Sequence, residues 1–251
     1  MSRVTLFITG TDTGVGKTVL AVLLARCWRE AGVSVGALKP FCSGGREDAS
    51  ALRVALGGAM PLDEINPWHF AAPLTPLLAA RREGKFIRLK KVLNHLQKAR
   101  RRFDVTIVEG AGGLLSPLGE DFSARELIAR LQATPIVVCP NRLGAINQTL
   151  LVMAALPRRV ARRARVVLMS QPKPDSSARS NLALLTKLMG PRRVRTIPWL
   201  QESQVAGRIP LDRSACRAVA GLLGELENDG LTEVSRLPGK RPRNSQPCAP
   251  H

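Results

Sequence analysis

The sequence predicts a single α/β domain built on a mostly parallel β-sheet with helices on both faces. Short β-branched, apolar segments alternate along the chain with longer segments of helical periodicity, which is the pattern of repeated strand–helix units. A glycine-rich turn joins the first strand signal to the first helix signal. With 251 residues, 45% of them hydrophobic, the chain can bury one large core. We expect this domain to span residues 1–228.

The expected elements follow one another in a regular order. Residues 4–9 form the first buried strand and residues 18–31 the first helix, with Leu20, Leu23, Leu24 and Cys27 on one stripe. Further strands are expected at 33–38, 104–108, 135–139 and 165–169, and residues 197–200 are expected to be a strand end that passes into a loop. Further helices are expected at 49–56, 88–102 and 214–226. We expect residues 42–48 to form a loop and the proline-rich residues 61–76 to be irregular. Residues 229–251, rich in Pro, Gly, Arg and Ser, are predicted to be a flexible basic tail.

The charge is strongly positive, with 38 Lys and Arg against 19 Asp and Glu, a net charge of +19. Such a charge attracts phosphates and nucleic acids. However, the basic residues are scattered along the chain, there is no Tyr, and aromatic residues make up 4%, so stacking platforms for single-stranded bases are scarce. These features favour solvated, Arg-rich surfaces over a nucleic-acid partner, which we do not expect.

Cysteine spacing and hydropathy exclude several other classes. The five cysteines are scattered and form no C-x-x-C pair, which argues against a disulfide framework or a zinc site. No apolar run approaches the roughly 20 residues that span a membrane, and the apolar residues 4–8 are too few for a signal peptide. We therefore expect a cytoplasmic protein without a membrane partner.

The strongest motif is the segment 10–18, GTDTGVGKT, which follows an apolar strand and opens a helix. In a P-loop, backbone amides of such a turn converge on phosphate, and glycines allow the backbone to approach it closely. The lysine reaches the β- and γ-phosphates, and the hydroxyl after it binds Mg²⁺. The alternative, a tight turn with a surface lysine, explains less of the pattern. The motif predicts a P-loop NTPase domain that binds a nucleotide through Asp12, Thr13, Gly14, Val15, Gly16, Lys17 and Thr18.

Two further clusters follow strand ends. Glu109 ends the strand before the Gly110–Gly113 run, a position suited to a carboxylate on the metal side of the phosphates. Lys39 leaves the second strand at the same sheet edge, where its charge can stabilise a transferring phosphoryl group. Asp48 is either a second metal carboxylate or the N-cap of a helix starting at Ala49.

Taken together and in this order, the motifs resemble the dethiobiotin synthetase family. The resemblance runs from about residue 4 to 200. Its matching segments are the P-loop, Lys39-Pro40 with Ser43, Asp48, Asn66-Pro67-Trp68, 109–113, 143–147 and 198–200. The P-loop alone is shared by many families, so the combination carries the specificity.

The resemblance implies an ATP- and Mg²⁺-dependent enzyme that carboxylates 7,8-diaminononanoate with CO₂ and closes the ureido ring through a carbamate and a carbamic–phosphoric anhydride. By position it assigns catalytic roles to Lys17, Lys39, Ser43 and Thr13, and Mg²⁺ binding to Thr18, Asp48 and Glu109. It assigns substrate binding to Lys39, Ser43, Gly112, Leu143, Gly144 and Asn147, and nucleotide contacts to Ser170, Pro198, Trp199 and Leu200. It also implies a homodimer.

Some features depart from the family pattern, and other classes remain to be compared. Ser170 stands where the family has an adenine-reading asparagine, and one hydroxyl cannot make a bidentate contact, so the nucleotide preference stays open. A partitioning-type ATPase would carry a lysine five residues before Lys17, where this chain has Asp12, and a GTPase would carry an Asn-Lys-x-Asp motif. A sister P-loop ligase and a nucleic-acid-binding protein remain as alternatives.

Overall fold

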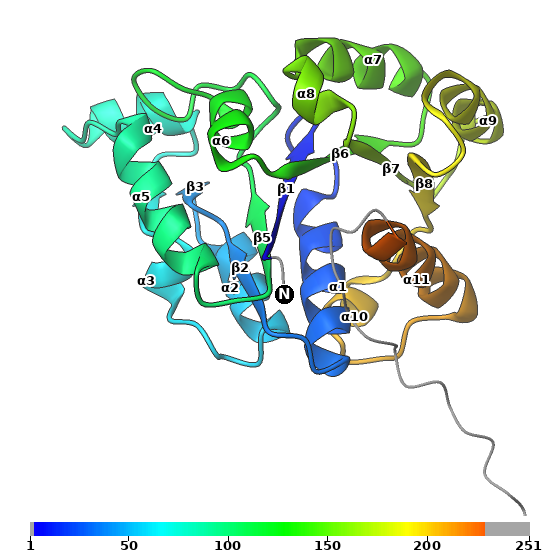
Figure 1. Cartoon of the computed structure of the whole chain (residues 1–251), viewed down its shortest axis with the longest axis horizontal. Coiled ribbons are helices and arrows are strands. Elements are labelled where there is room, and N and C mark those ends of the chain that lie inside the picture. Colours follow the sequence, from blue (N-terminus) through cyan, green and yellow to red (C-terminus); the bar gives the residue numbers. More distant parts are fainter. Residues whose placement is uncertain (1–2, 229–251) are drawn as a thin grey trace, which may run out of the picture.

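The computed structural model describes residues 3–228 and contains a six-stranded, fully parallel sheet (Figure 1). The strand order across the sheet is β2-β5-β1-β6-β7-β8. The strands are β1 (Val4–Gly10), β2 (Val35–Leu38), β5 (Val105–Glu109), β6 (Thr134–Pro140), β7 (Arg165–Met169) and β8 (Val194–Ile197). The predicted fold class, a mostly parallel α/β domain, is confirmed.

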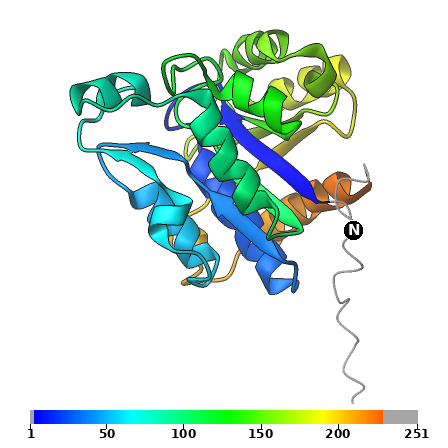
Figure 2. The same ribbon diagram turned by 60° about the vertical axis from the view of Figure 1, so that its left-hand side comes forward.

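Helices cover both faces of this sheet. On one face, α1 (Lys17–Glu30) packs on β1, β2 and β5, and α11 (Arg213–Asn228) packs on β8. On the other lie α5 (Leu89–Arg100), α6 (Ala124–Leu131), α7 (Ala145–Ala155) and α9 (Ala178–Met189). Figure 2 shows α5 in front of β1, with α1 behind it. Five shorter helices complete the set within residues 3–228: α2 (Glu47–Ala55), α3 (Leu62–Ile65), α4 (Pro76–Arg82), α8 (Arg158–Ala161) and α10 (Glu202–Val205).

The local sequence explains where the central elements begin and end. All residues of β1 are buried because both faces of the sheet are covered, which is why the strand is a continuous apolar run. Helix α1 begins after Gly16, whose left-handed φ of 97° suits glycine. Ser123 and Glu126 form a capping box at the start of α6.

Two segments predicted to lack regular structure form a small second sheet. The expected loop 42–48 contains the end of β3 (Phe41–Ser43) and the start of α2, and the expected irregular stretch 61–76 contains α3 (Leu62–Ile65) and β4 (Trp68–Phe70). Strands β3 and β4 pair in parallel. Buried Asn66 joins the two segments, because its side-chain amide donates to the carbonyl oxygens of Lys39 at 2.8 Å and Pro40 at 3.3 Å. These contacts are long-range, so the local turn residues gave no sign of them.

The parallel sheet places its strand ends at two opposite edges. The P-loop, Lys39 and Glu109 follow the carboxyl ends of β1, β2 and β5, which are neighbours in the sheet. Within residues 3–228, no helix is both long and apolar enough to cross a bilayer. The predicted tail, 229–251, lies outside the described residues.

Candidate phosphate and metal site

The P-loop wraps around the start of α1. Gly14 and Gly16 have left-handed φ angles of 71° and 97°, and a Cβ atom on Gly10 would lie 2.7 Å from the side chain of Val15. The backbone amides in the first turn of α1 have no acceptor within the helix. They are therefore available to an anion, which the positive end of the helix also attracts.

Lys17 is buried at the head of this loop, and its ammonium donates to the backbone oxygen of Asp12 at 2.7 Å. Burial, followed by repulsion from the nearby ammonium of Lys39, lowers the pKa of Lys17 to about 8. A phosphate placed in the loop would offset both effects. Among residues 3–228, no carboxylate forms an ion pair with the Lys17 ammonium, so the loop holds a cationic side chain that an anionic ligand could pair with.

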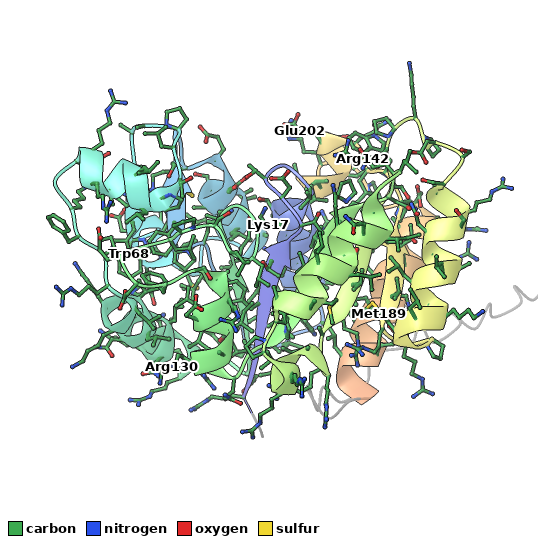
Figure 3. The ribbon with its side chains drawn as sticks, turned by 90° about the horizontal axis from the view of Figure 1, so that it is seen from above. Lys17, Trp68, Arg130, Arg142, Met189 and Glu202 are labelled. Atoms are coloured by element: carbon green, nitrogen blue, oxygen red, sulfur yellow. The ribbon has the colours of Figure 1, made fainter. Side chains whose placement is uncertain are left out.

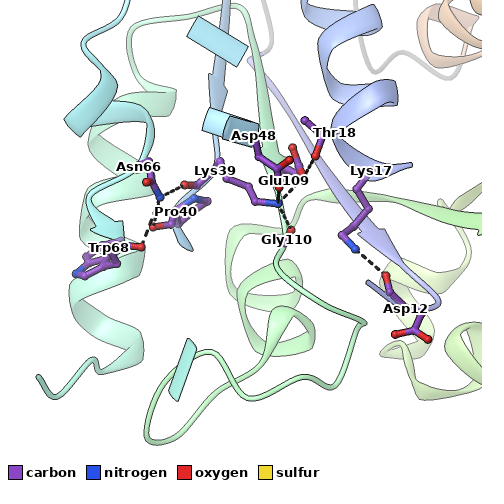
Figure 4. A network of polar contacts seen from close by, with 10 residues as sticks. All are labelled: Asp12, Lys17, Thr18, Lys39, Pro40, Asp48, Asn66, Trp68, Glu109 and Gly110. Atoms are coloured by element: carbon purple, nitrogen blue, oxygen red, sulfur yellow. Dashed lines mark hydrogen bonds and ion pairs between the residues drawn. The ribbon is translucent and has the colours of Figure 1, made fainter. Parts of the chain in front are cut away.

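Lys39 lies at the centre of a second cluster (Figure 4). Its ammonium contacts Glu109 Oε1 at 2.5 Å, Asp48 Oδ2 at 2.9 Å and the Gly110 carbonyl oxygen at 3.1 Å. Burial opposes the charge, but the two carboxylates outweigh burial and raise the pKa of Lys39 above its ordinary value. The Lys39 ammonium in turn lowers the pKa of the Asp48 carboxyl, against the effect of that carboxyl's own burial.

The N-cap interpretation of Asp48 is wrong. Helix α2 begins at Glu47, the N-cap position is Arg46, and Asp48 lies in the first turn with its carboxylate on Lys39. The structure therefore brings together the three residues predicted to bind metal. Thr18 Oγ1 donates to Glu109 Oε1 at 2.7 Å, and Lys39 bridges Glu109 and Asp48.

These three residues fit a divalent cation. They offer two carboxylates and a hydroxyl, which are the hard oxygen ligands that Mg²⁺ prefers. Glu109 Oε2 is buried without a hydrogen-bond partner among the described residues, so an oxygen is available. The Lys39 ammonium lies between the two carboxylates, so these carboxylates already stabilise a positive charge at this position.

A cavity of 680 Å³ opens between the P-loop and the β3–β4 sheet. Of the predicted site residues, it is lined by Thr13, Gly14, Gly16, Lys17, Thr18, Lys39, Ser43, Asp48, Glu109 and Gly112. Ser43 Oγ is buried without a partner in the described part of the chain, which leaves it free to bind a ligand. Asp12 is exposed and Val15 is buried beneath the loop, so neither lines the cavity.

Sequence reasoning missed several residues that line this cavity: Phe41, Cys42, Pro73, Leu74, Thr75, Pro76 and Ser116. Residues 73–76 come from the proline-rich segment, where the sequence carries no chemical signal. Ser116 lies just beyond the glycine run and accepts a hydrogen bond from the Gly113 amide at 2.9 Å. Its distance from Glu109 in the sequence concealed its place in the site.

The remaining predicted residues form two groups at the same sheet edge but outside this cavity. The Ser170 amide donates to the Ile197 carbonyl oxygen at 2.9 Å, which brings Ser170 next to Pro198, Trp199 and Leu200. Met169 links this group to the P-loop, since a Cβ atom on Gly16 would lie 3.1 Å from its side chain.

The second group comprises Leu143, Gly144 and Asn147 at the start of α7. The Leu143 amide already donates to the Asp175 carboxylate at 2.8 Å. An incoming carboxylate at that amide would therefore have to displace Asp175, and the next amide but one, that of Ala145, already donates to the Arg142 carbonyl oxygen at 3.0 Å. The sequence gave no sign of this competition.

The sequence of this chain is similar to a family model and to proteins that share one name. A family model described as "AAA domain" matches residues 4–214. An ATP-dependent dethiobiotin synthetase BioD of Anaeromyxobacter dehalogenans (strain 2CP-C) is 41% identical over 81% of this chain and 92% of its own length. The protein of the same name from Bacillus subtilis (strain 168) is 36% identical over 73% of this chain and 82% of its own length.

Two solved structures share the fold at much lower identity. The MinC:MinD cell division protein complex of Aquifex aeolicus matches with a TM-score of 0.58 and 17% identity, covering 95% of this chain and 99% of that chain. A putative plasmid partition protein of Borrelia burgdorferi B31, bound to AMPPNP, matches with a TM-score of 0.57 and 12% identity, covering 91% of this chain and 100% of that chain. These similarities establish a common fold and no more.

Proposed function

Because the chain belongs to the ATP-dependent dethiobiotin synthetase family, we propose that it converts 7,8-diaminononanoate, CO₂ and ATP into dethiobiotin, ADP and phosphate. The observation that carries this proposal is the single cavity in which P-loop residues, Lys39, Ser43 and two carboxylates meet. A phosphoryl donor and a second substrate need such a shared space, because the reacting groups must lie within about 3.5 Å of each other.

The reaction proceeds in three steps. One amine of the substrate attacks CO₂, forms an N–C bond and loses a proton, which gives a carbamate. A carbamate oxygen attacks the γ-phosphorus of ATP; the bond to the bridging oxygen breaks and ADP leaves. The second amine then attacks the carbonyl carbon of the resulting anhydride, loses a proton and expels phosphate as the ring closes.

The residues of the cavity have distinct proposed roles. Lys17 stabilises the β- and γ-phosphates, and Lys39 stabilises charge on the transferring phosphoryl group. Thr13, Ser43 and Gly112 position the carbamate or the phosphate from the cavity wall. Thr18, Asp48 and Glu109 hold Mg²⁺, which supplies positive charge beside the phosphates when bound.

The base of the nucleotide is proposed to lie near Ser170 and residues 198–200. Trp199 is 54% exposed and offers a flat surface there. Gln171, which follows Ser170 in the chain, carries a carboxamide, but its side-chain nitrogen already donates to the Met169 carbonyl oxygen at 3.0 Å. With a serine at 170, we expect weak discrimination between bases.

A homodimer is proposed from the surface of α7 and α9. Most of α7 points away from the core, with only Ala145 and Thr149 buried. Leu151 of α7 is 62% exposed, Leu143 just before the helix is 81% exposed, and Leu184 and Leu188 on the neighbouring α9 are exposed as well. A partner covering this surface would also cover residues 143–147, where we propose that the substrate carboxylate binds. Leu151→Glu should then yield a monomer in light-scattering measurements.

The test supplies 7,8-diaminononanoate, bicarbonate and Mg²⁺ with ATP, GTP or CTP, and detects dethiobiotin by mass spectrometry. We expect product with the unmodified protein, and none with Lys17→Ala or Lys39→Ala. The exposed lysine variant Lys90→Ala serves as the matched control and should retain activity. Folded protein that binds Mg-nucleotide yet forms no product with any nucleotide would instead indicate a sister ligase.

A further inference from the structure

The basic residues that are scattered in the sequence gather at the edge of the sheet opposite the P-loop. The parallel strands β5, β1, β6, β7 and β8 are neighbours, and a basic residue or segment lies shortly before each of them in the chain. These segments are residues 98–102, Arg3, Arg130, residues 158–163 and residues 192–193. Since the amino ends of parallel strands share one edge, the five segments form one surface, here called the amino-edge surface. Figure 3 shows Arg130 at this edge, away from Lys17, among many nitrogen-tipped side chains.

Hydrogen bonds connect the segments and make the surface continuous. Arg100 donates to the Leu131 carbonyl oxygen at 2.9 Å, and Arg163 donates to the Gln132 carbonyl oxygen at 3.1 Å. Arg193 donates to the carbonyl oxygens of Ala161 at 2.5 Å and Ala164 at 3.1 Å. Three half-buried arginines thus join residues 98–102, the end of α6 that carries Arg130, residues 158–163 and residues 192–193, whereas Arg3 is positioned by β1 itself.

Besides these three half-buried arginines, the amino-edge surface carries exposed guanidinium groups. Within residues 3–228, no side-chain hydrogen bond or ion pair occupies Arg101, Arg130, Arg158, Arg159, Arg162 and Arg192, all of which are exposed. Among the described residues, three acidic groups lie near this surface: Glu64 pairs with Arg102, Glu225 pairs with Arg195 of β8, and Asp104 is exposed just before β5. The surface therefore carries a large uncompensated positive charge on a rigid support.

The sequence alone did not predict a nucleic-acid partner, because its basic residues are scattered along the chain. Since folding gathers them at one edge, we propose that the amino-edge surface binds the phosphate backbone of a nucleic-acid duplex without reading its sequence. Four strand spacings of about 4.8 Å separate β5 from β8, so the basic stripe is about 19 Å long. Along a duplex this corresponds to about six base pairs, which is enough for four to six phosphate contacts. Guanidinium groups suit this role because they bind phosphate oxygens in pairs.

The side chains at this edge favour a duplex over other polyanions. The five segments contribute none of the exposed large apolar or aromatic side chains; Leu188, near the end of α9, is close to them in the chain, and Phe86 and Trp199 lie beyond the opposite ends of α5 and β8. A single strand would lack stacking partners, and a membrane-bound surface would lack apolar groups to insert. Because the P-loop lies at the opposite edge, duplex binding should be independent of nucleotide.

The test measures fluorescence anisotropy of a labelled 20-base-pair DNA duplex with the full chain, between 50 and 200 mM salt. We expect a logarithmic salt slope of about −4 to −5, from about 0.9 per phosphate contact. The triple variant Arg158→Glu, Arg159→Glu, Arg162→Glu should weaken binding roughly 100-fold and flatten the slope by about 2 to 3. Arg101→Glu, Arg130→Glu, Arg192→Glu should weaken it similarly, because the stripe is continuous.

The matched control, Arg82→Glu, Lys90→Glu, Lys91→Glu, has the same change in net charge but lies on α4 and the first turn of α5. The control and both test variants all contain residues 229–251. The control should bind the duplex with an affinity within about threefold of the unmodified protein. Equal weakening by control and test variants would attribute binding to overall charge and overturn the proposal. Binding to phosphatidylserine vesicles in preference to DNA or RNA duplexes would also overturn it, as would competition by Mg-ATP.

Discussion

Replacing the P-loop lysine should stabilise the nucleotide-free protein while abolishing nucleotide binding. Folding lowers the pKa of Lys17 from 10.5 to about 8. At about 1.4 kcal/mol per pKa unit, holding this charge in the folded state costs about 3 kcal/mol below pH 8. Lys17→Met removes the charge at similar size, and it loses the hydrogen bond to the Asp12 carbonyl oxygen, which is worth about 1 kcal/mol.

The net gain of about 2 kcal/mol corresponds to a rise in Tm of about 4–8 °C at pH 7 for a chain of this size. Between pH 8 and 10.5 the folded wild type loses the Lys17 proton while the unfolded chain keeps it, so wild-type stability rises with pH relative to the variant. The difference in Tm should therefore shrink across this range. Thermal unfolding by circular dichroism, without nucleotide, measures it at several pH values.

The exposed lysine variant Lys90→Met is the control, because its removal relieves no burial cost. Mg-ATP should raise the Tm of the wild type and of this control, and leave that of Lys17→Met unchanged. A Lys17→Met protein that unfolds below the wild-type Tm at pH 7, or a difference independent of pH, would refute the electrostatic reasoning.

Three further changes probe the framework of the site. Glu109→Ala should destabilise the protein by about 3 kcal/mol in urea unfolding, because buried Lys39 loses its closest carboxylate, and Glu109→Ala with Lys39→Met should recover part of that loss. Asn66→Ala should cost about 1–3 kcal/mol and weaken nucleotide binding in calorimetry, since it removes the donor to the Lys39 carbonyl oxygen, whereas the Pro40 carbonyl oxygen still accepts from the Trp68 amide; an unchanged urea midpoint would contradict this. Gly36→Ala should cost about 1–3 kcal/mol, because its Cβ would lie 2.3 Å from the Phe103 ring, and Phe103→Leu should rescue it; a lack of rescue would place the strain elsewhere.

Much of the fold was predictable because its signals are local. The apolar run of β1, the glycines of the P-loop and the helical periodicity of α1 each lie within a short stretch of sequence. Parallel topology then determines which strand ends share an edge, so Lys39 and Glu109 were expected beside the P-loop, and they lie there. The errors occurred where regular structure depends on distant partners, as in β3 and β4, which are joined by Asn66.

The sequence by itself determined the phosphate-binding turn, the parallel sheet and the family. Only the tertiary structure decided the rest. It placed Asp48 on Lys39 rather than at a helix N-cap, and occupied the Leu143 amide with Asp175. It also gathered scattered arginines along one edge of the sheet. The physical reason is that secondary structure depends mainly on residues that are close in the sequence. Charges interact through space, between segments that only folding brings together.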